Sequence, residues 1–582
     1  MQTFEDFKED ILKYLQQQKE YEQEDIANNE NLPEELKVEK GLLVRGAEVI
    51  ECKDSCYNIR TFEDNSKMRI GDKVRIKVGT KKAFAKIIDF GLNEISLECR
   101  EKIAVGQRID IEILECVILD PLISLLESIE EGKPGASLLK QLANIEEPRG
   151  RGLGAINIDD VDVVPEYMDE SKRTIIGETL QRPSLYCIQG PPGTGKTAVL
   201  SVIAQAYASK RKDVLVIANT HQAVNNALNK IAQADEILTV IKIGEELKSE
   251  GLVPSVSVLK TYNSYLKFRK EKKKNNANIV GMTLHAAVVN LGIRNGGFQP
   301  SIVLVDEAGQ IPMPFASLIG TFGSGSVVFI GDDKQMPPIF HPKLIDNKFS
   351  TSIFAYVCKQ YPSMRKILNV TYRMNGTITS FVSEAFYESD SSNQRIYSDK
   401  EISKRTLSYP LENIKSSDII IKEILSSSKS LFICDVNDSN EYKDSNWTET
   451  RFSFDLFKEV QHQGLPTNEI AIITPYRRQV KSITSYFIDN GWTQDKMPLI
   501  NTVECLQGQD VEMIVISFCI SDLEFLKQQK GFLFDYHRLN VMISRAKTKV
   551  VLLMSDIVQK EFRQLYDNVL KDMHEQISYL KR

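Results

Sequence analysis

The sequence lacks long hydrophobic runs. Its unbroken apolar stretches are only a few residues long, as in Ile302–Val305, whereas a membrane-spanning helix needs about 20 residues. Four acidic side chains fall within the first ten residues, where a signal peptide would carry an apolar segment. We therefore expect a cytoplasmic protein without a membrane partner.

Cysteine is also scarce, with nine residues in a chain of 582. Only Cys52 and Cys56 lie close together, and no second Cys or His pair stands nearby to complete a zinc site. Adding Cys99 and Cys116 does not produce the clustered spacing of an iron–sulfur site. We expect all nine cysteines to be reduced thiols.

An excess of positive charge is absent as well. The 73 Lys and Arg residues are outnumbered by 79 Asp and Glu, which gives a net charge of −6. Nucleic-acid-binding proteins usually carry a basic balance, so a nucleic-acid site in this chain must be a local groove. Hydrophobic residues make up 42% and charged residues 26%, which is typical of a folded globular protein.

The N-terminal part predicts a small β-barrel on a helical stalk. Residues 1–36 place apolar side chains at helical spacing and predict a stalk helix. Residues 37–118 contain short alternating segments, such as Val74, Ile76 and Val78, that predict a small antiparallel barrel. Residues 119–164 predict further stalk helices and a linker.

From residue 165 the pattern changes to buried strands that alternate with helices, which indicates parallel α/β sheets. We assign residues 165–360 to a first such domain, with an insertion at about 230–280, and residues 361–582 to a second. The second domain is expected to include a strand at Lys366–Val370, a surface insertion at Glu388–Lys429, and one or two helices after Met554.

The segment GPPGTGKT at residues 190–197 fits a phosphate-binding loop. It follows an apolar strand and opens a helix, which is the context that the motif requires. Backbone N–H groups would surround the phosphates, and the helix N-terminus would add partial positive charge. Lys196 would contact the β- and γ-phosphates, and Thr197 would bind Mg²⁺. The loop comprises Gly190, Pro191, Pro192, Gly193, Thr194, Gly195, Lys196 and Thr197.

Two acidic residues, Asp306 and Glu307, end the buried strand at Ile302–Val305. Open α/β sheets bind ligands at this end of their strands. Asp306 would bind Mg²⁺, and Glu307 would act as the general base for the attacking water. Gln335 follows another apolar strand and is positioned to sense the γ-phosphate, although a plain β-turn is the simpler interpretation of that segment.

Phosphoryl transfer also needs positive charge on the transition state. Arg373, in the segment TYRM, and Arg545, in the segment RLNVMISRA, are candidates in the second α/β domain. A surface ion pair is the commoner role of any single arginine, so these two residues alone decide nothing.

Seven segments together resemble the motifs of superfamily 1 helicases, between about residue 180 and residue 555. They are GPPGTGKT, DEAGQ, GDDKQMPP, TYRM, ITPYRRQ, VECLQGQD and RLNVMISRA. The chain is most similar to class B, the group of the nonsense-mediated-decay RNA helicase, the immunoglobulin-mu-binding helicase and the Dna-two nuclease-helicase. The resemblance implies an α/β fold with two RecA-like P-loop domains, and a small β-barrel on a helical stalk that precedes the first.

The resemblance also implies roles for individual residues in binding ATP and Mg²⁺. ATP would lie in a cleft between the two domains, with Asp306 and Glu307 as the Walker B pair. The other implied roles are γ-phosphate recognition by Gln310 and Gln335, arginine fingers at Arg373 and Arg545, adenine stacking by Tyr372, and approach to the ribose by Asp510.

Single-stranded or tailed nucleic acid would lie across both domains, and the motifs do not say whether it is RNA or DNA. Hydroxyls and backbone amides would grip phosphates without reading bases. The residues implied are Asn219, Thr220, Thr283, Thr474, Pro475, Arg477 and Thr502. Taken singly, Thr220 or Thr502 would be interpreted as an ordinary surface threonine of a strand, and only the motif context favours a role in nucleic-acid binding.

Two features depart from the family pattern or stand outside it. Lys172 aligns with a glutamine that reads adenine in the family, and lysine accepts no hydrogen bond. Either nucleotide use is looser than ATP alone, or Gln181 or a shifted alignment supplies the missing glutamine. The basic run at residues 267–274 is either a solvated face or a contact for nucleic acid or a partner protein.

The resemblance implies an ATP-dependent helicase or translocase that moves 5′ to 3′ on single strands. The alternative is an ATP-switched clamp that recruits an effector, such as a separate nuclease, without processive unwinding. A further alternative is that the barrel recognises specific RNA, and that the motor only remodels ribonucleoprotein.

Overall fold

A computed structural model describes most of the chain. The described residues are 2–29, 32–39, 41–53, 55–61, 68, 72–79, 81–91, 94–115, 119–133, 135–235, 237–244, 249, 251–272, 277–290, 292, 298–323, 325–388, 394–493, 496–506 and 510–582. The chain forms two compact units. The first comprises Met1–Gln189, Lys196–Asp333 and Pro337–Lys366, and the second Gly190–Gly195, Lys334–Met336 and Ile367–Arg582.

The first unit begins with a closed six-stranded barrel and its stalk. The barrel order is β1-β2-β5-β4-β3-β6, and alternate side chains such as Val74 and Ile76 fill its interior. Its elements are α1 (Phe4–Asn29), α2 (Glu34–Glu39), β1 (Leu43–Lys53), β2 (Cys56–Arg60), β3 (Lys73–Val78), β4 (Lys81–Gly91), β5 (Glu94–Cys99) and β6 (Arg108–Glu115).

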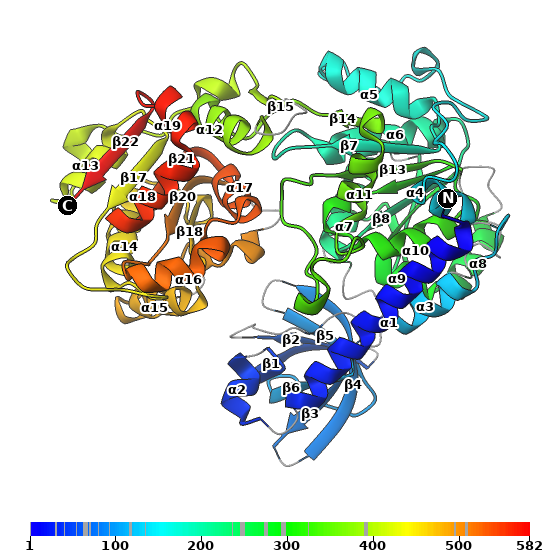
Figure 1. Ribbon diagram of the computed structural model, residues 1–582, viewed down its shortest axis with the longest axis horizontal. Coiled ribbons are helices and arrows are strands. Elements are labelled where there is room, and N and C mark those ends of the chain that lie inside the picture. Colours follow the sequence, from blue (N-terminus) through cyan, green and yellow to red (C-terminus); the bar gives the residue numbers. More distant parts are fainter. Residues whose placement is uncertain are drawn as a thin grey trace. The chain divides into compact units, whose positions relative to one another are not determined.

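The stalk helix α1 packs on α3 (Leu119–Glu127) and α4 (Ala136–Leu142). Phe7, Ile11 and Leu15 recur at intervals of four residues and are buried on one face, against Leu122 and Leu126 of α3. Figure 1 shows α1 running beside α3 and continuing to the barrel. The stalk therefore shares its core with the α/β domain that follows.

An eight-stranded sheet forms the rest of the first unit, in the order β10-β9-β11-β8-β12-β13-β7-β14. Its strands are β7 (Leu185–Gln189), β8 (Val214–Ala218), β9 (Thr239–Ile243), β10 (Val256–Leu259), β11 (Asn278–Thr283), β12 (Ile302–Val305), β13 (Val327–Gly331) and β14 (Arg365–Ile367). Its helices are α5 (Glu170–Leu180), α6 (Lys196–Ser209), α7 (His221–Ala234), α8 (Tyr262–Lys272), α9 (Leu284–Val289), α10 (Ala316–Thr321) and α11 (Ile353–Gln360).

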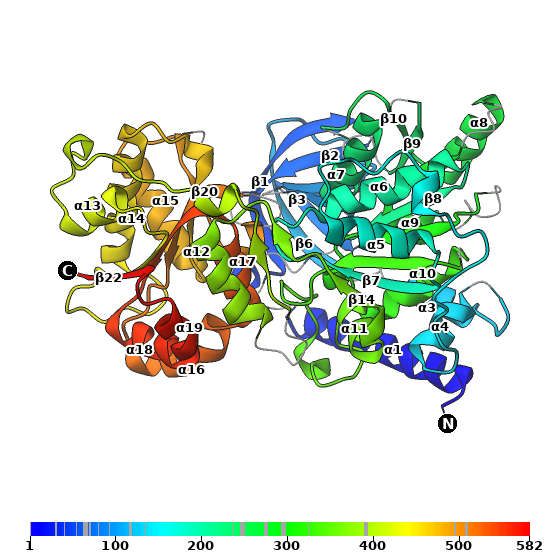
Figure 2. The same ribbon diagram turned by 90° about the horizontal axis from the view of Figure 1, so that it is seen from above.

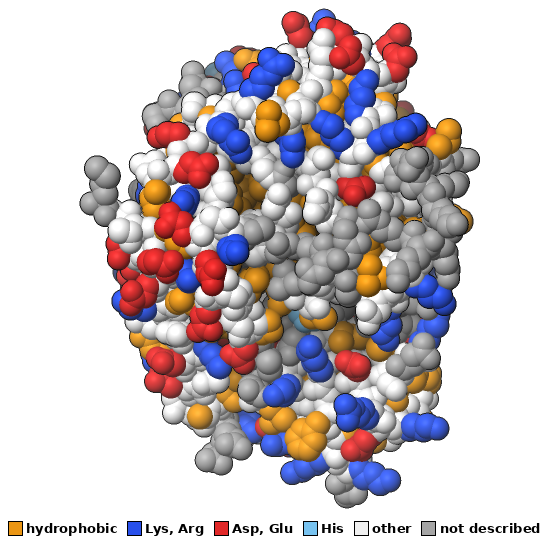
Figure 3. All heavy atoms as spheres, turned by 90° about the vertical axis from the view of Figure 1, so that its right-hand side faces the viewer, with side chains coloured by type: hydrophobic (Ala, Val, Ile, Leu, Met, Phe, Trp, Pro, Cys, Tyr) orange, Lys and Arg blue, Asp and Glu red, His pale blue; other side chains and the backbone are white. Residues whose placement is uncertain are grey.

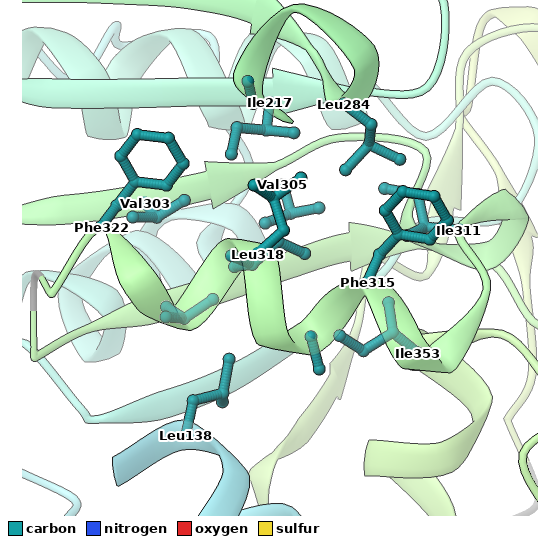
Figure 4. Packing of buried hydrophobic residues seen from close by; sticks show 14 of the residues in the cluster. Leu138, Ile217, Leu284, Val303, Val305, Ile311, Phe315, Leu318, Phe322 and Ile353 are labelled. Atoms are coloured by element: carbon teal, nitrogen blue, oxygen red, sulfur yellow. The ribbon is translucent and has the colours of Figure 1, made fainter. Parts of the chain in front are cut away.

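Helices cover both faces of this sheet. Figure 2 shows α6 and α7 on one side and α10 and α11, with the stalk, on the other. The core on the stalk side joins Ile217, Val305 and Leu318 to Leu138 of α4 (Figure 4). The central strands are buried on both faces, which explains their continuous apolar sequences.

The second unit contains a six-stranded sheet in the order β19-β18-β20-β21-β17-β22, with neighbouring strands parallel. Its strands are β17 (Leu431–Asp435), β18 (Ile470–Ile473), β19 (Leu499–Asn501), β20 (Val511–Ser517), β21 (Ala546–Leu553) and β22 (Ile577–Lys581), and a small pair is formed by β15 (Val370–Thr371) and β16 (Tyr397–Ser398). Its helices are α12 (Gly376–Val382), α13 (Ile419–Ser426), α14 (Trp447–His462), α15 (Arg477–Asp489), α16 (Leu523–Leu533), α17 (Tyr536–Ser544), α18 (Asp556–Leu565) and α19 (Asp567–Asp572).

Figure 2 shows α13, α14 and α15 on one side of this sheet, and α16, α18 and α19 on the other. Both units are thus helix-covered parallel sheets, and the predicted fold class, with its barrel and stalk, is confirmed. Among the described residues, no helix combines the length and the apolar character needed to cross a bilayer.

Three local expectations were wrong. The strand expected at Lys366–Val370 is instead β14, which adds to the first sheet beside β7, followed by the short β15. The tail after Met554 forms α18 and α19 but also β22, which pairs with β17. The stretch Glu388–Lys429 is not all a surface insertion, because α13 buries Ile421 and Ile424 in the core of the second unit. Each error concerns pairing or packing with residues far away in the sequence.

Candidate nucleotide site and nucleic-acid interface

The phosphate-binding loop connects β7 to α6. Gly193 and Gly195 have φ angles of 74° and 87°, in the left-handed region that L side chains rarely adopt. The Thr194 hydroxyl donates to the Pro191 carbonyl oxygen at 2.8 Å and closes the turn. Lys196 begins α6, so the first backbone N–H groups of that helix lack helical partners and can bind an anion. Thr197 follows in the same turn.

Asp306 and Glu307 follow β12 directly. The Asp306 carboxylate is buried, and its Oδ1 accepts the Glu307 N–H at 3.0 Å. Glu307 has a left-handed φ of 50°, a strained conformation of the kind that clusters at active sites. The Gln310 amide donates to Glu307 Oε2 at 3.2 Å, so the predicted γ-phosphate reader and the predicted base are already in contact.

The ionisation of Asp306 depends on its surroundings. Burial raises the pKa of the Asp306 carboxyl to about 7, and the Glu307 charge adds to the rise, while the Lys196 charge opposes it. A bound divalent cation would favour the ionised form. A buried carboxylate in this position therefore suits a Mg²⁺ ligand, since Mg²⁺ is commonly held by one or two carboxylates together with substrate phosphates.

The segments after β12 and β13 pack directly against each other. A Cβ atom at Gly309 would lie 2.6 Å from the Asp332 carbonyl oxygen, so only glycine allows this approach. Because β12, β13 and β7 are adjacent and parallel, Asp306, Asp332 and Gly190 follow strands at the same edge of the sheet.

Two residues that the sequence analysis did not single out join this edge. The Gln189 amide donates to Asp332 at 3.2 Å and to Asp333 at 3.0 Å. Arg365 donates from Nε to Gln189 Oε1 at 2.8 Å and pairs with Asp333 at 3.4 Å. Gln189 directly precedes the phosphate-binding loop, which is a usable signal. Arg365 has no such signal, because its place depends on β14 lying beside β7.

Residues Gly190–Gly195 of the phosphate-binding loop belong to the second unit, together with Tyr372 and Arg373. Thr371 Oγ1 donates to the Pro192 carbonyl oxygen at 2.8 Å, and the Tyr372 N–H donates to the Gly193 carbonyl oxygen at 2.9 Å. A Cβ atom at Gly193 would lie 2.4 Å from the Arg373 Cβ. Tyr372 is 40% exposed, as a stacking side chain would need to be.

Arg373 and Arg545, the two predicted fingers, meet at Asp510. Arg373 Nη2 lies 2.6 Å and Arg545 Nη1 lies 3.8 Å from Asp510 Oδ1. Gln335 belongs to a segment beside them in the same unit, where the Asn540 amide donates to the Lys334 carbonyl oxygen at 2.7 Å.

The predicted nucleic-acid residues of the first unit lie at the carboxyl ends of β8 and β11. These strands are neighbours, so Asn219 and Thr220 lie close to Thr283. The Thr220 hydroxyl accepts the Ala223 N–H, and the Thr283 hydroxyl accepts the Ala286 N–H, both at 3.2 Å. Both threonines are therefore helix N-caps, and Thr283 is buried.

In the second unit, the predicted nucleic-acid residues follow the adjacent strands β18 and β19. Thr474, Pro475 and Thr502 are buried, whereas Arg477, the first residue of α15, is exposed. Arg545 and Asp510 instead precede β21 and β20. In the second sheet, the residues predicted to contact the nucleotide therefore lie at the amino ends of the strands. The residues predicted to contact nucleic acid lie at the carboxyl ends.

Comparison with known proteins shows which helicases this chain is similar to. Two family models, both described as AAA domain, match residues 167–274 and 349–556. The chain is 28% identical over 414 residues to the DNA replication ATP-dependent helicase/nuclease dna2 of Schizosaccharomyces pombe, covering 67% of this chain and 28% of the relative.

Two further relatives extend the comparison. The chain is 26% identical to the uncharacterized ATP-dependent helicase MJ0104 of Methanocaldococcus jannaschii, covering 70% and 71% of the two chains. It is 27% identical to the ATP-dependent helicase NAM7 of Saccharomyces cerevisiae, covering 67% and 42%. The chain is thus similar to the Dna2- and NAM7-like ATP-dependent helicases, as its superfamily 1 motifs predicted.

This chain covers less than a third of its yeast Dna2 relatives, 28% of one and 25% of another. Among solved structures, the arterivirus nonstructural protein 10 helicase aligns with 90% of this chain and 78% of its own at 12% identity and a TM-score of 0.40, a likeness too low to bear on function.

Against the family pattern, Lys172 is the clearest departure. It lies in the first turn of α5, is buried, and forms an ion pair with Asp169, the N-cap residue of that helix. The Asp169 carboxylate also accepts the Lys172 N–H at 2.9 Å. The pair thus provides a buried donor and a partly exposed acceptor at the position aligned with the family's amide.

The basic run at residues 267–274 falls at the end of α8. Lys267 is exposed on that helix, but Lys273 and Lys274 lie outside the described residues. Of the expected insertion at about 230–280, β9 and β10 extend the main sheet. Within the described part of the chain, no three His, Cys, Asp or Glu side chains gather into a metal-binding group, and the cysteines with described side chains are free thiols.

Proposed function

We propose that this protein is an ATP-dependent nucleic-acid motor that uses Mg²⁺ and moves 5′ to 3′ on a single strand. Hydrolysis would drive duplex unwinding or nucleoprotein remodelling. The observation that carries the proposal is the concentration of reactive groups at one sheet edge: the phosphate-binding loop, the buried Asp306 and the strained Glu307. This arrangement is what in-line attack of water on a γ-phosphate requires.

In this reaction the protein's own groups have distinct tasks. Lys196 and the loop N–H groups would hold the phosphates, and Asp306 and Thr197 would hold Mg²⁺, which supplies charge neutralisation on the phosphate oxygens. Glu307 would orient water and accept its proton, and the Gln310 amide, which donates to Glu307 Oε2 at 3.2 Å, would hold the carboxylate in position. Arg373 stands against the loop and would add positive charge there.

Nucleic acid is the proposed track because polar residues that can contact a phosphate backbone follow β8, β11, β18 and β19. A motor that moves along any sequence does not require groups that read the bases. The barrel supports this proposal with a groove of about 970 Å³, whose charged lining residues are Lys37, Lys73, Arg75, Lys86 and Arg100 with Glu98, Glu101 and Glu112. Glu112 pairs with Lys37 and Arg75, and the other basic residues of the lining are Lys73, Lys86 and Arg100. Figure 3 views the molecule from the right-hand side of Figure 1. It shows Lys and Arg side chains at the lower end of this face, the level at which Figure 1 places the barrel. An overall negative chain thus carries a groove in which basic side chains outnumber acidic ones.

The groove also contains an exposed aromatic side chain, and it lies near Thr283, one of the predicted nucleic-acid residues of the first unit. Phe84, at its edge, is 69% exposed and is suited to stacking on a base. Burial lowers the pKa of His285 to about 4, and the charge of Lys86 contributes to the shift. Lys86 of the barrel therefore lies close to the helix that Thr283 caps.

The test is the steady-state ATPase rate with single-stranded RNA, with single-stranded DNA, or with neither, using Lys196→Ala as the blank. A motor is expected to hydrolyse ATP faster with one of the polymers and to unwind a tailed duplex of that polymer. Turnover above the blank that neither polymer stimulates would replace the motor with the ATP-switched clamp. Turnover equal to the blank would remove the enzymatic proposal altogether.

A further inference from the structure

A single carboxylate is shared by the two predicted arginine fingers. Asp510 Oδ1 lies 2.6 Å from Arg373 Nη2 and 3.8 Å from Arg545 Nη1. Both arginine side chains are nearly buried, at 13% and 8% exposure, whereas Asp510 is 36% exposed. One oxygen atom therefore faces two desolvated cations.

The backbone fixes this trio from three directions. The Val511 N–H donates to the Arg545 carbonyl oxygen at 3.1 Å, so Asp510 and Arg545 are placed by the first contact between β20 and β21. Arg373 Nη1 donates to the Ser544 carbonyl oxygen at 3.1 Å. The residue before one arginine thus holds the side chain of the other.

Charge explains why the carboxylate is needed. Two guanidinium groups held side by side repel each other, and partial burial weakens the screening by water. A carboxylate that forms ion pairs with both lowers that repulsion, and its removal would take the shared counter-charge away from two nearly buried cations. Since Asp510 is partly open to solvent, it can release the arginines at little desolvation cost when a more highly charged anion arrives.

We propose that Asp510 is a positioning residue that holds Arg373 and Arg545 together as a preassembled pair and yields them to the nucleoside triphosphate. This inference rests on the proposed function. It differs from the role that the family resemblance implies for Asp510, which is to approach the ribose. A preassembled pair reduces the reorganisation needed in the transition state, so the carboxylate would act on turnover more than on nucleotide binding.

The experiment compares Asp510→Asn and Asp510→Glu with the unaltered chain. Asp567→Asn is the matched control, because Asp567 also pairs with a basic residue, Lys571, on the exposed helix α19. For each protein, kcat and KM are measured with ATP and with 2′-deoxy-ATP. Thermal melting checks that each variant is folded, and Asp510→Glu keeps the charge if the amide proves disruptive.

A positioning role predicts a split between the two constants. Asp510→Asn should lower kcat by about tenfold or more, with KM for ATP changed by less than about threefold. Asp510→Glu should recover most of the loss, and the preference for ATP over 2′-deoxy-ATP should be the same in all variants. Adding Asp510→Asn to Arg373→Ala should cost little more than Arg373→Ala alone, because the two residues act as a unit.

Other results would overturn the inference. If Asp510→Asn leaves kcat unchanged, the carboxylate is only a surface ion-pair partner. If it raises KM and erases the preference for ATP over 2′-deoxy-ATP, Asp510 contacts the ribose instead. Failure of the proposed function looks different, because the unaltered chain would then hydrolyse ATP no faster than the Lys196→Ala blank.

Discussion

The rings of His341 and Tyr21 stack with their centroids 5.3 Å apart and their planes inclined by 26°. This contact joins the segment after Met336 to the stalk helix α1. Lys343 adds an ion pair with Glu24 at 2.9 Å. Gln335 is predicted to contact the γ-phosphate. The segment that follows it is thus attached to α1, the helix that leads to the barrel.

Phe349 should contribute strongly to the stability of this attachment. Its ring is 1% exposed and lies 5.8 Å from Phe7 and 5.9 Å from Tyr14. Phe349→Ala should destabilise the first unit by about 3–5 kcal/mol, as large-to-small core substitutions do, measured by urea unfolding. Phe84→Ala, at an exposed phenylalanine, should change stability by less than about 0.5 kcal/mol. Equal effects would contradict the packing described here.

Glu307→Gln should bind ATP and nucleic acid but not turn over. The substitution keeps the shape and the contact with Gln310 but removes the proton acceptor. Nucleotide binding is measured by fluorescence titration and turnover by phosphate release. Glu524→Gln, at an exposed surface pair with Lys527, should be fully active. Full activity in Glu307→Gln would remove Glu307 as the general base.

Arg545→Ala should lower kcat by about 10³-fold or more if its guanidinium acts as an arginine finger. Single-turnover hydrolysis with saturating ATP measures the chemical step. Arg451→Ala is the control, because Arg451 forms an exposed pair with Asp455 on α14 and should have no effect. A loss smaller than about tenfold in Arg545→Ala would assign Arg545 a structural role.

Lys172 should relax the choice of nucleotide. Its ammonium group donates but cannot accept, so it cannot reproduce both hydrogen bonds of an amide to adenine. The ratio of kcat/KM for ATP to that for GTP should be within about tenfold for the unaltered chain, and it should rise in Lys172→Gln. A strong ATP preference that Lys172→Gln leaves unchanged would show that another group reads the base.

Glu449 should make stability depend on pH. It is fully buried, and burial raises its pKa from 4.5 to about 7, although hydrogen bonds from Ser517 and Cys519 oppose the shift and the charge of Asp435 adds to it. Between these two values the folded protein binds one more proton at this site than the unfolded chain does. This group therefore lowers stability as pH rises through that window.

The comparison for Glu449 is the melting temperature at pH 5 and pH 7. The unaltered chain should lose more stability over this interval than Glu449→Gln, in which the site no longer titrates. Other titrating groups are common to both proteins and cancel in the difference. Identical pH slopes would contradict the raised pKa.

Local sequence patterns were sufficient to predict several features of the fold and of the candidate site. The phosphate-binding loop could be located because glycines at 193 and 195 permit backbone angles that other residues do not. Asp306 could be placed at a sheet edge because an unbroken apolar strand precedes it. The alternation of Val74 and Ile76 indicated the barrel, since a period of two is the direct consequence of strand geometry.

Other features depended on contacts that no local pattern records. The hydroxyls of Thr220 and Thr283 accept backbone N–H groups as helix caps, which competes with a simple role in gripping phosphate. Arg365 joins Gln189 only because β14 pairs beside β7. Neither strand order nor the partner of a buried charge can be read from spacing along the chain.

By itself, the sequence determined the two parallel α/β domains, the barrel, the phosphate-binding loop and the carboxylates at the end of β12, because these follow from short-range periodicity and from glycine and strand chemistry. Only the tertiary structure decided that β22 completes the second sheet and that Asp510 lies between Arg373 and Arg545. The physical reason is that strand pairing and charge burial are set by residues distant in the chain, whose meeting depends on the whole fold.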